Sequence, residues 1–124
     1  MSASATKPES NACFIYVTTG SIDEAKTIGR KLVETRLAAC VNIIDPMISL
    51  YWWEGKVQEG NETVLIAKTT AVKVAALTAA VCELHSYDCP CAIALPIVDG
   101  NADYVDWIGR EAANEDCQIM TPDL

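Results

Sequence analysis

Several features that identify a function directly are missing from this 124-residue sequence. It contains a single histidine and only nine Lys and Arg residues against 17 Asp and Glu residues, which gives a formal net charge of −8. An acidic chain without a basic stripe is poorly suited to nucleic acid or to an anionic membrane. No apolar run is long enough to span a bilayer, and the first ten residues lack the apolar segment of a secretory signal. We therefore expect a cytoplasmic protein with no nucleic-acid or membrane partner.

Common catalytic and cofactor motifs are also missing. No glycine-rich loop follows a strand pattern with the spacing of a P-loop or a dinucleotide fingerprint, and no Gly-x-Ser-x-Gly motif is present. With one histidine, nucleophilic schemes reduce to a thiolate pair of Cys40 and His85, and nothing in the sequence shows that these two residues meet. We expect no enzymatic activity, no catalytic residue and no organic cofactor.

The six cysteines do not indicate a disulfide framework. The sequence has no Cys-x-x-Cys motif, so the usual zinc-ribbon and thioredoxin spacings are missing. A reducing compartment keeps thiols free, and a chain of this length can build a core without disulfides. Cys13, Cys40 and Cys82 lie in apolar runs and are predicted to be small buried side chains. Cys89 and Cys91 are considered separately below.

Hydrophobic patterning predicts one domain over residues 11–113, a disordered leader at 1–10 and a tail of uncertain structure at 114–124. Ser21 and Glu24 form a capping box that opens the first helix. Pro96 indicates an edge strand, and Asp45-Pro46 is expected to end the second strand. The order of elements is β-α-β-β-α-β followed by a C-terminal helix, which predicts an α+β fold of the ferredoxin-like type. The expected strands cover 12–19, 37–44, 47–53, 63–67 and 91–98, and the expected helices cover 22–36, 70–84 and 102–112.

A long β-hairpin is predicted where residues 47–53 turn at 54–56 and return along 63–67. The adjacent Trp52 and Trp53 must point to opposite faces of the strand. One of them is expected to face the core. The other needs a second partner, which is either a neighbouring subunit or a C-terminal element, and aromatic enrichment at interfaces favours the subunit.

Metal-ligand types are concentrated between His85 and Cys91. This segment holds one imidazole, the Asp88 carboxylate and the thiols of Cys89 and Cys91. Imidazole and thiolate together suit copper and zinc, so His85, Cys91 and Cys89 are candidate metal ligands. The simpler interpretation of His85 is a helix C-cap that donates to the last helical carbonyls.

Six segments of the chain together resemble the CutA divalent-cation tolerance family, over about residues 12–112. The resemblance implies a ferredoxin-like protomer in a tight homotrimer, in which the long hairpins join subunits and leave clefts between them. The matching segments are ETRLAACVNI (34–43), SLYWWEGKV (49–57), LIAKT (65–69), HSYDCP (85–90), ALPI (94–97) and GNADYVDWI (100–108). Cleft-lining positions implied by the resemblance are Cys40, Trp53, Glu59, Lys68, His85, Tyr87 and Tyr104.

The chain also departs from the family pattern. Ser86 and Cys91 stand where the family usually has proline and glutamate. Val17 and Leu84 stand where some bacterial relatives described as copper-binding carry a cysteine and the first histidine of a pair. Cys91 in place of glutamate supplies a softer ligand.

Two interpretations of function follow. The first is a non-catalytic trimeric protein of metal tolerance that binds copper or zinc. The second is a trimeric sensor similar to the PII signalling proteins, in which Lys68 and Glu59 hold an anionic or amphoteric small molecule in the intersubunit cleft. A purely structural or interaction role is a third possibility.

Overall fold

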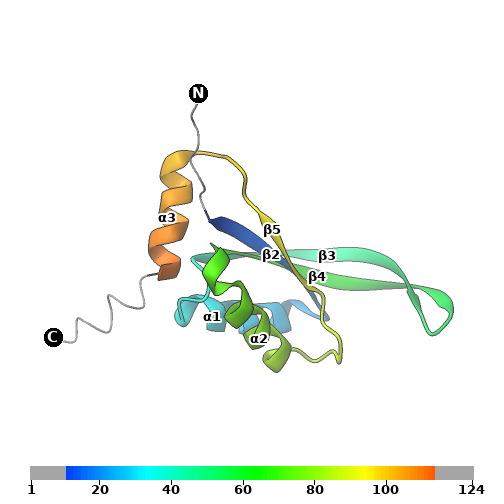
Figure 1. The fold of residues 1–124 in the computed structure, drawn as a ribbon. Helices are drawn as coiled ribbons and strands as arrows, with labels where there is room; N and C mark the ends of the chain where they lie inside the picture. The colour runs from blue at the N-terminus through cyan, green and yellow to red at the C-terminus, as the bar shows by residue number, and fades with distance from the viewer. Residues whose placement is uncertain (1–10, 114–124) are drawn as a thin grey trace.

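A four-stranded antiparallel sheet forms the centre of the computed structural model, which describes residues 11–113 (Figure 1). The order of strands across the sheet is β3-β4-β2-β5. This order and the sequence of elements confirm the predicted ferredoxin-like arrangement. The predicted leader and tail lie outside the described residues. In chain order the elements are β2 (Ala12–Thr19), α1 (Ile22–Glu34), β3 (Cys40–Trp53), β4 (Lys56–Thr70), the 3-10 turn η1 (Ala71–Lys73), α2 (Val74–Leu84), β5 (Ala92–Pro96) and α3 (Ala102–Ala113).

The hydrophobic core lies between one face of the sheet and helices α1 and α2. Strand β2 supplies Ile15 and Val17 to it, and β4 supplies Leu65, because alternate residues of a strand share a face. Helix α1 buries Ile28 and Leu32, which are four residues apart and therefore on one side of the helix. The opposite face of the sheet, which carries Phe14 and Tyr16, is covered by neither α1 nor α2 and is called the open face below.

Strand β3 does not end at Asp45-Pro46, so that prediction was wrong. Ile44 pairs with Val64 and Met47 pairs with Glu62, which places two residues of β3 opposite one residue of β4 in a β-bulge. The sheet accepts the proline because β3 is an edge strand, where a missing N–H costs little. The bulge also shifts the alternation of side chains, so that Met47 lies on the same open face as Ile44.

The hairpin formed by β3 and β4 is longer than predicted and projects beyond the helices (Figure 1). Its turn uses positive φ angles at Glu54 (52°) and Gly55 (78°), which suit a tight two-residue turn. Trp52 and Trp53 are 73% and 58% exposed. The expectation that one of them faces the core was wrong, because the hairpin extends past the helices that would cover it.

The edge position predicted from Pro96 is confirmed, since β5 is the last strand of the sheet. The five cysteines in the described part of the chain are free thiols. Cys13 is buried as predicted, and burial raises the pKa of its thiol. Cys40 is half-buried, whereas Cys82 is exposed, contrary to prediction. Leu77 and Val81 form the buried side of α2, and the 100° step from Val81 turns Cys82 away from it.

No helix within residues 11–113 is long and apolar enough to cross a membrane.

Two helical glycines offer a matched test of core packing. A Cβ added at Gly29 in α1 would lie 2.8 Å from Val41 Cγ2, whereas a Cβ at Gly109 in α3 would meet nothing within 4 Å. Alanine is favoured over glycine in a helix by about 1 kcal/mol, and overpacking costs about 1–3 kcal/mol. We predict that Gly29→Ala lowers the free energy of unfolding by about 1 kcal/mol and that Gly109→Ala raises it by about 0.5–1 kcal/mol. Chemical denaturation at a fixed protein concentration measures both, and stabilisation by Gly29→Ala would contradict the packing described.

Candidate functional site

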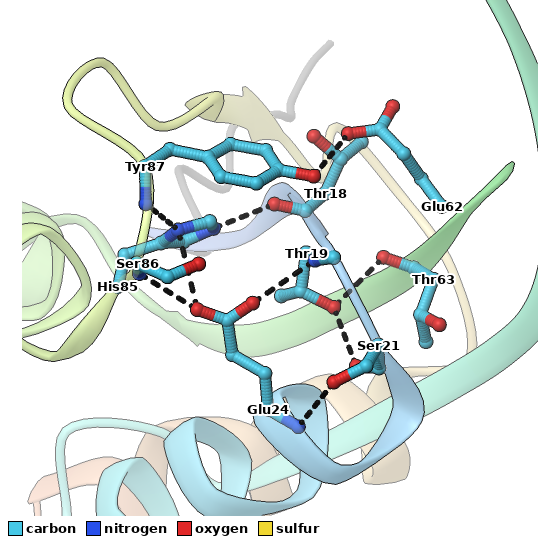
Figure 2. A network of polar contacts seen from close by, with 10 residues as sticks. Thr18, Thr19, Ser21, Glu24, Glu62, Thr63, His85, Ser86 and Tyr87 are labelled. Atoms are coloured by element: carbon cyan, nitrogen blue, oxygen red, sulfur yellow. Dashed lines mark hydrogen bonds and ion pairs between the residues drawn. The ribbon is translucent and has the colours of Figure 1, made fainter. Parts of the chain in front are cut away.

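His85 is a buried polar residue that links the end of α2 to strand β2. It follows α2 directly, and its side chain is fully buried. Its Nε2 lies 2.7 Å from the carbonyl oxygen of Thr18 in β2, and its Nδ1 accepts a hydrogen bond from the N–H of Tyr87 at 3.1 Å (Figure 2). Since Nδ1 accepts, Nε2 must carry the proton and donate to Thr18, so the geometry assigns the neutral Nε2–H tautomer. His85 occupies the predicted C-cap position of α2. The expected hydrogen bond from its ring to the α2 carbonyls was wrong, because the ring reaches across to Thr18 in β2.

Glu24 joins the start of α1 to residues 85–87, the segment that follows α2. Its backbone N–H donates to Ser21 Oγ at 3.1 Å, which confirms the predicted cap. Its carboxylate accepts from the N–H of Gly20 at 3.0 Å and from the N–H of Ser86 at 2.7 Å (Figure 2). Burial works against the charge of this carboxylate, but the hydrogen bonds from Gly20 and Ser86 hold its pKa below the usual range. Glu24 and His85 together attach residues 85–87 to the sheet.

Tyr87 points over β2 toward the hairpin. Its hydroxyl donates to Glu62 Oε2 at 3.0 Å (Figure 2). Ser49 Oγ donates to Glu62 Oε1 at 2.7 Å. Burial, the hydrogen bond to Glu62 and the charges of Glu62 and Glu24 raise the pKa of Tyr87 to about 12. The phenol therefore stays protonated at neutral pH, in a region of negative potential.

A pocket of about 840 Å³ lies between Tyr87 and the β3–β4 hairpin. Its lining comes from β2, from the β3–β4 hairpin and from residues 87–91. Among the described residues that line it there is no lysine, arginine or histidine. The lining includes four aromatic side chains (Tyr16, Tyr51, Trp53 and Tyr87), two carboxylates (Glu62 and Asp88) and the sulfur-containing side chains of Met47, Cys89 and Cys91.

The positions that the resemblance places in an intersubunit cleft fall into separate groups within one chain. Lys68 Nζ donates to the Tyr104 hydroxyl at 3.2 Å, and Cys40 Sγ lies 3.7 Å from the same hydroxyl. Tyr87 lies with His85 beside the pocket, at ring centroids 4.6 Å apart.

Two further cleft positions, Trp53 and Glu59, lie on the projecting hairpin. The contacts described do not join Cys40 to His85, so they give no support to a thiolate pair of these two residues.

No group of three His, Cys, Asp or Glu side chains within residues 11–113 is placed to hold a metal ion. Both nitrogens of His85 are already engaged in hydrogen bonds. Cys89 is exposed and Cys91 is half-buried, so the two thiols remain accessible at the edge of the pocket. The residues that the structure describes therefore offer two accessible thiols on the pocket lining rather than a complete, preformed coordination sphere.

Sequence analysis missed the contribution of Tyr16 and Glu62 to this site. Glu62 lies in the returning arm of the hairpin, but the predicted arm began one residue later. Tyr16 was predicted only as part of a buried strand. It pairs with a residue of β4 on one side and of β5 on the other, and its side chain points to the open face of the sheet. Strand alternation was the available signal, because Tyr16 and Thr18 share a face.

Comparisons with known proteins agree on one family. The sequence model of the family described as CutA1 divalent ion tolerance protein matches residues 13–111 of this chain. The divalent-cation tolerance protein CutA of Archaeoglobus fulgidus is 45% identical over 95 residues, which cover 77% of this chain and 92% of that protein. A CutA homologue of Xenopus laevis is 47% identical over 94 residues, covering 76% of this chain and 62% of that protein. A solved structure, described as the periplasmic divalent cation tolerance protein CutA of A. fulgidus, aligns with a TM-score of 0.78 and 42% identity, covering 82% of this chain and 98% of that one.

The raised pKa of Tyr87 gives a direct test of the described contact. Replacing Glu62 with glutamine removes the charge that opposes a phenolate and weakens the hydrogen bond that favours the phenol. We predict that the pKa of Tyr87 falls in Glu62→Gln from about 12 toward the ordinary value near 10. Ultraviolet titration measures it as the difference between each protein and the same protein carrying Tyr87→Phe. An unchanged value would show that Glu62 does not face the phenol.

Proposed function

Because this chain belongs to the CutA1 divalent ion tolerance family, we propose that it acts as a non-catalytic homotrimer that binds copper or zinc. The family is named for tolerance to divalent ions rather than for a reaction. The matches also favour metal tolerance over the alternative of a PII-like sensor. The observation that carries the metal proposal is the accessible pair of thiols, Cys89 and Cys91, beside a pocket that has carboxylates but no basic side chain among its described lining. We also propose that the protein is cytoplasmic, because free thiols suit a reducing compartment. The archaeal relative is instead described as periplasmic.

Assembly is supported by apolar surface that the single chain leaves uncovered. Ile48, Leu50 and Trp52 alternate along the hairpin and therefore share its face away from the open side, where they are 68%, 68% and 73% exposed. The outer side of β3 is also an unpaired edge of 14 residues. Long apolar edges of this kind pair with another chain unless they are protected. A second and third copy would cover both the edge and the apolar face.

We predict a particle of three times 13.4 kDa, about 40 kDa, in sedimentation at micromolar concentration. Trp52→Lys should dissociate it, because a charged side chain cannot be desolvated at an apolar contact without a large cost. Val72→Lys serves as the matched control, since Val72 is 85% exposed on η1, outside the hairpin. A folded wild-type monomer at micromolar concentration would contradict the proposed trimer, and so would an intact assembly of Trp52→Lys.

The metal proposal is best tested through the thiols rather than through His85. Loss of the imidazole would leave the Thr18 carbonyl and the Tyr87 amide without partners, at about 1–3 kcal/mol each, so His85→Ala would confuse folding with binding. The serine variants Cys89→Ser and Cys91→Ser change one atom at accessible positions. Cys82→Ser removes an exposed thiol on α2 and serves as the control.

We predict that each of Cys89→Ser and Cys91→Ser weakens Cu(I) or Zn(II) binding at least about tenfold in competition with a chromophoric chelator. Cys82→Ser should bind as the wild type does. Affinity should fall steeply as pH is lowered, because thiol ligands must lose their protons, whereas a carboxylate site would keep most of its affinity at about pH 5. Wild-type affinity in the double variant Cys89→Ser/Cys91→Ser would overturn the metal proposal at this position.

A further inference from the structure

The thiols of Cys89 and Cys91 lie on the same side of their segment. Both residues border the pocket described above, whereas Pro90 between them does not. Proline fixes its own φ at about −65° and biases the residue before it toward extended backbone. Alternate residues of an extended segment share one side. The Cys-Pro-Cys sequence therefore presents two sulfur atoms together, immediately before β5 begins at Ala92.

Other side chains that could bind a metal nearby do not complete this pair. Both ring nitrogens of His85 take part in hydrogen bonds, and its side chain is fully buried. The carboxylate of Glu62 accepts one hydrogen bond from Ser49 and one from Tyr87. Asp88 precedes Cys89 in the chain, but no group of three His, Cys, Asp or Glu side chains is placed to hold a metal within residues 11–113. The described residues thus supply two ligands at this position, and both are thiols.

Metal ions differ in whether two thiolates are sufficient. Zn(II) takes four ligands in tetrahedral geometry, and even its catalytic sites keep three protein ligands. Cu(II) prefers square-planar or tetragonal sets of nitrogen and oxygen ligands. Cu(I) is soft, is selected by thiolates, and forms stable near-linear complexes with two of them. Two sulfur atoms on one side of an extended segment therefore match Cu(I), whereas Zn(II) would lack half of its ligands.

We propose that Cys89 and Cys91 bind one Cu(I) ion between their two sulfur atoms, and that this pair does not select Zn(II). The inference rests on the metal-binding function proposed above and names its metal. On binding, two S–H bonds lose their protons to solvent and two Cu–S bonds form, so the complex of one Cu(I) and two thiolates carries a net charge of −1. No electron is transferred, because copper arrives as Cu(I), the state that a compartment with reduced thiols maintains.

Competition titrations on full-length protein test this preference. The protein is freed of metal with EDTA, reduced and kept under anaerobic conditions, and bicinchoninate reports Cu(I) while 4-(2-pyridylazo)resorcinol reports Zn(II) in a separate titration. We expect Cys89→Ser and Cys91→Ser each to weaken Cu(I) binding at least about tenfold and to change Zn(II) binding less than about twofold. Cys91→Glu should weaken Cu(I) binding as much as Cys91→Ser, because its carboxylate offers a hard oxygen in place of a soft sulfur.

Cys82→Ser is the matched control, since it removes an exposed thiol from α2, and it should bind both ions as the wild type does. Equal losses of Cu(I) and Zn(II) affinity in the variants of Cys89 and Cys91, or a loss for Zn(II) alone, would overturn the Cu(I) preference and leave the metal proposal standing. Wild-type affinity for both ions in Cys89→Ser/Cys91→Ser would overturn both.

X-ray absorption of the wild-type protein loaded with Cu(I) gives a second measurement that needs no variant. We expect two sulfur ligands, with no nitrogen or oxygen ligand. A third ligand in the spectrum, whether from His85 or from another copy of the chain, would overturn the two-coordinate site even if a serine variant failed to fold.

Discussion

The buried imidazole of His85 connects two parts of the fold on which the pocket depends. Its Nε2 holds the Thr18 carbonyl of β2, and its Nδ1 holds the amide of Tyr87 after α2. A buried donor or acceptor without a partner costs about 1–3 kcal/mol. Moving the segment after α2 away from the sheet would therefore be energetically unfavourable. Glu24 reinforces the attachment through Ser86. The position of Tyr87, and through it the orientation of Glu62, follows from these contacts.

The β3–β4 hairpin gives the second constraint. A bulge at Asp45-Pro46 shifts the alternation of β3, which brings Met47, Ser49 and Tyr51 to the open face and turns Ile48, Leu50 and Trp52 to the other. The pocket lining nevertheless includes Ile48 and Leu50 from the second face as well as Met47, Ser49 and Tyr51 from the first. Without the extra residue, Ile48, Leu50 and Trp52 would point to the open face of the sheet instead.

Much of the fold was predictable because its signals are local. The capping box at Ser21, the apolar run of β2 and the Pro96 edge strand each depend on a few neighbouring residues. The errors came from contacts between distant segments. The proline within β3 is tolerated because β3 lies at the edge of the sheet, and this position is set by its pairing with β4 alone.

The role of His85 depends on the same kind of contact, since the Thr18 carbonyl lies 67 positions away. The tautomer of His85 at neutral pH tests the account most directly, and long-range ¹H–¹⁵N NMR correlations of the imidazole measure it. The account predicts a proton on Nε2, an unprotonated Nδ1, and no change when zinc is added. A ring protonated on Nδ1, or an Nε2 resonance that shifts on binding zinc, would contradict the structural role assigned to His85 and return it to the set of metal ligands.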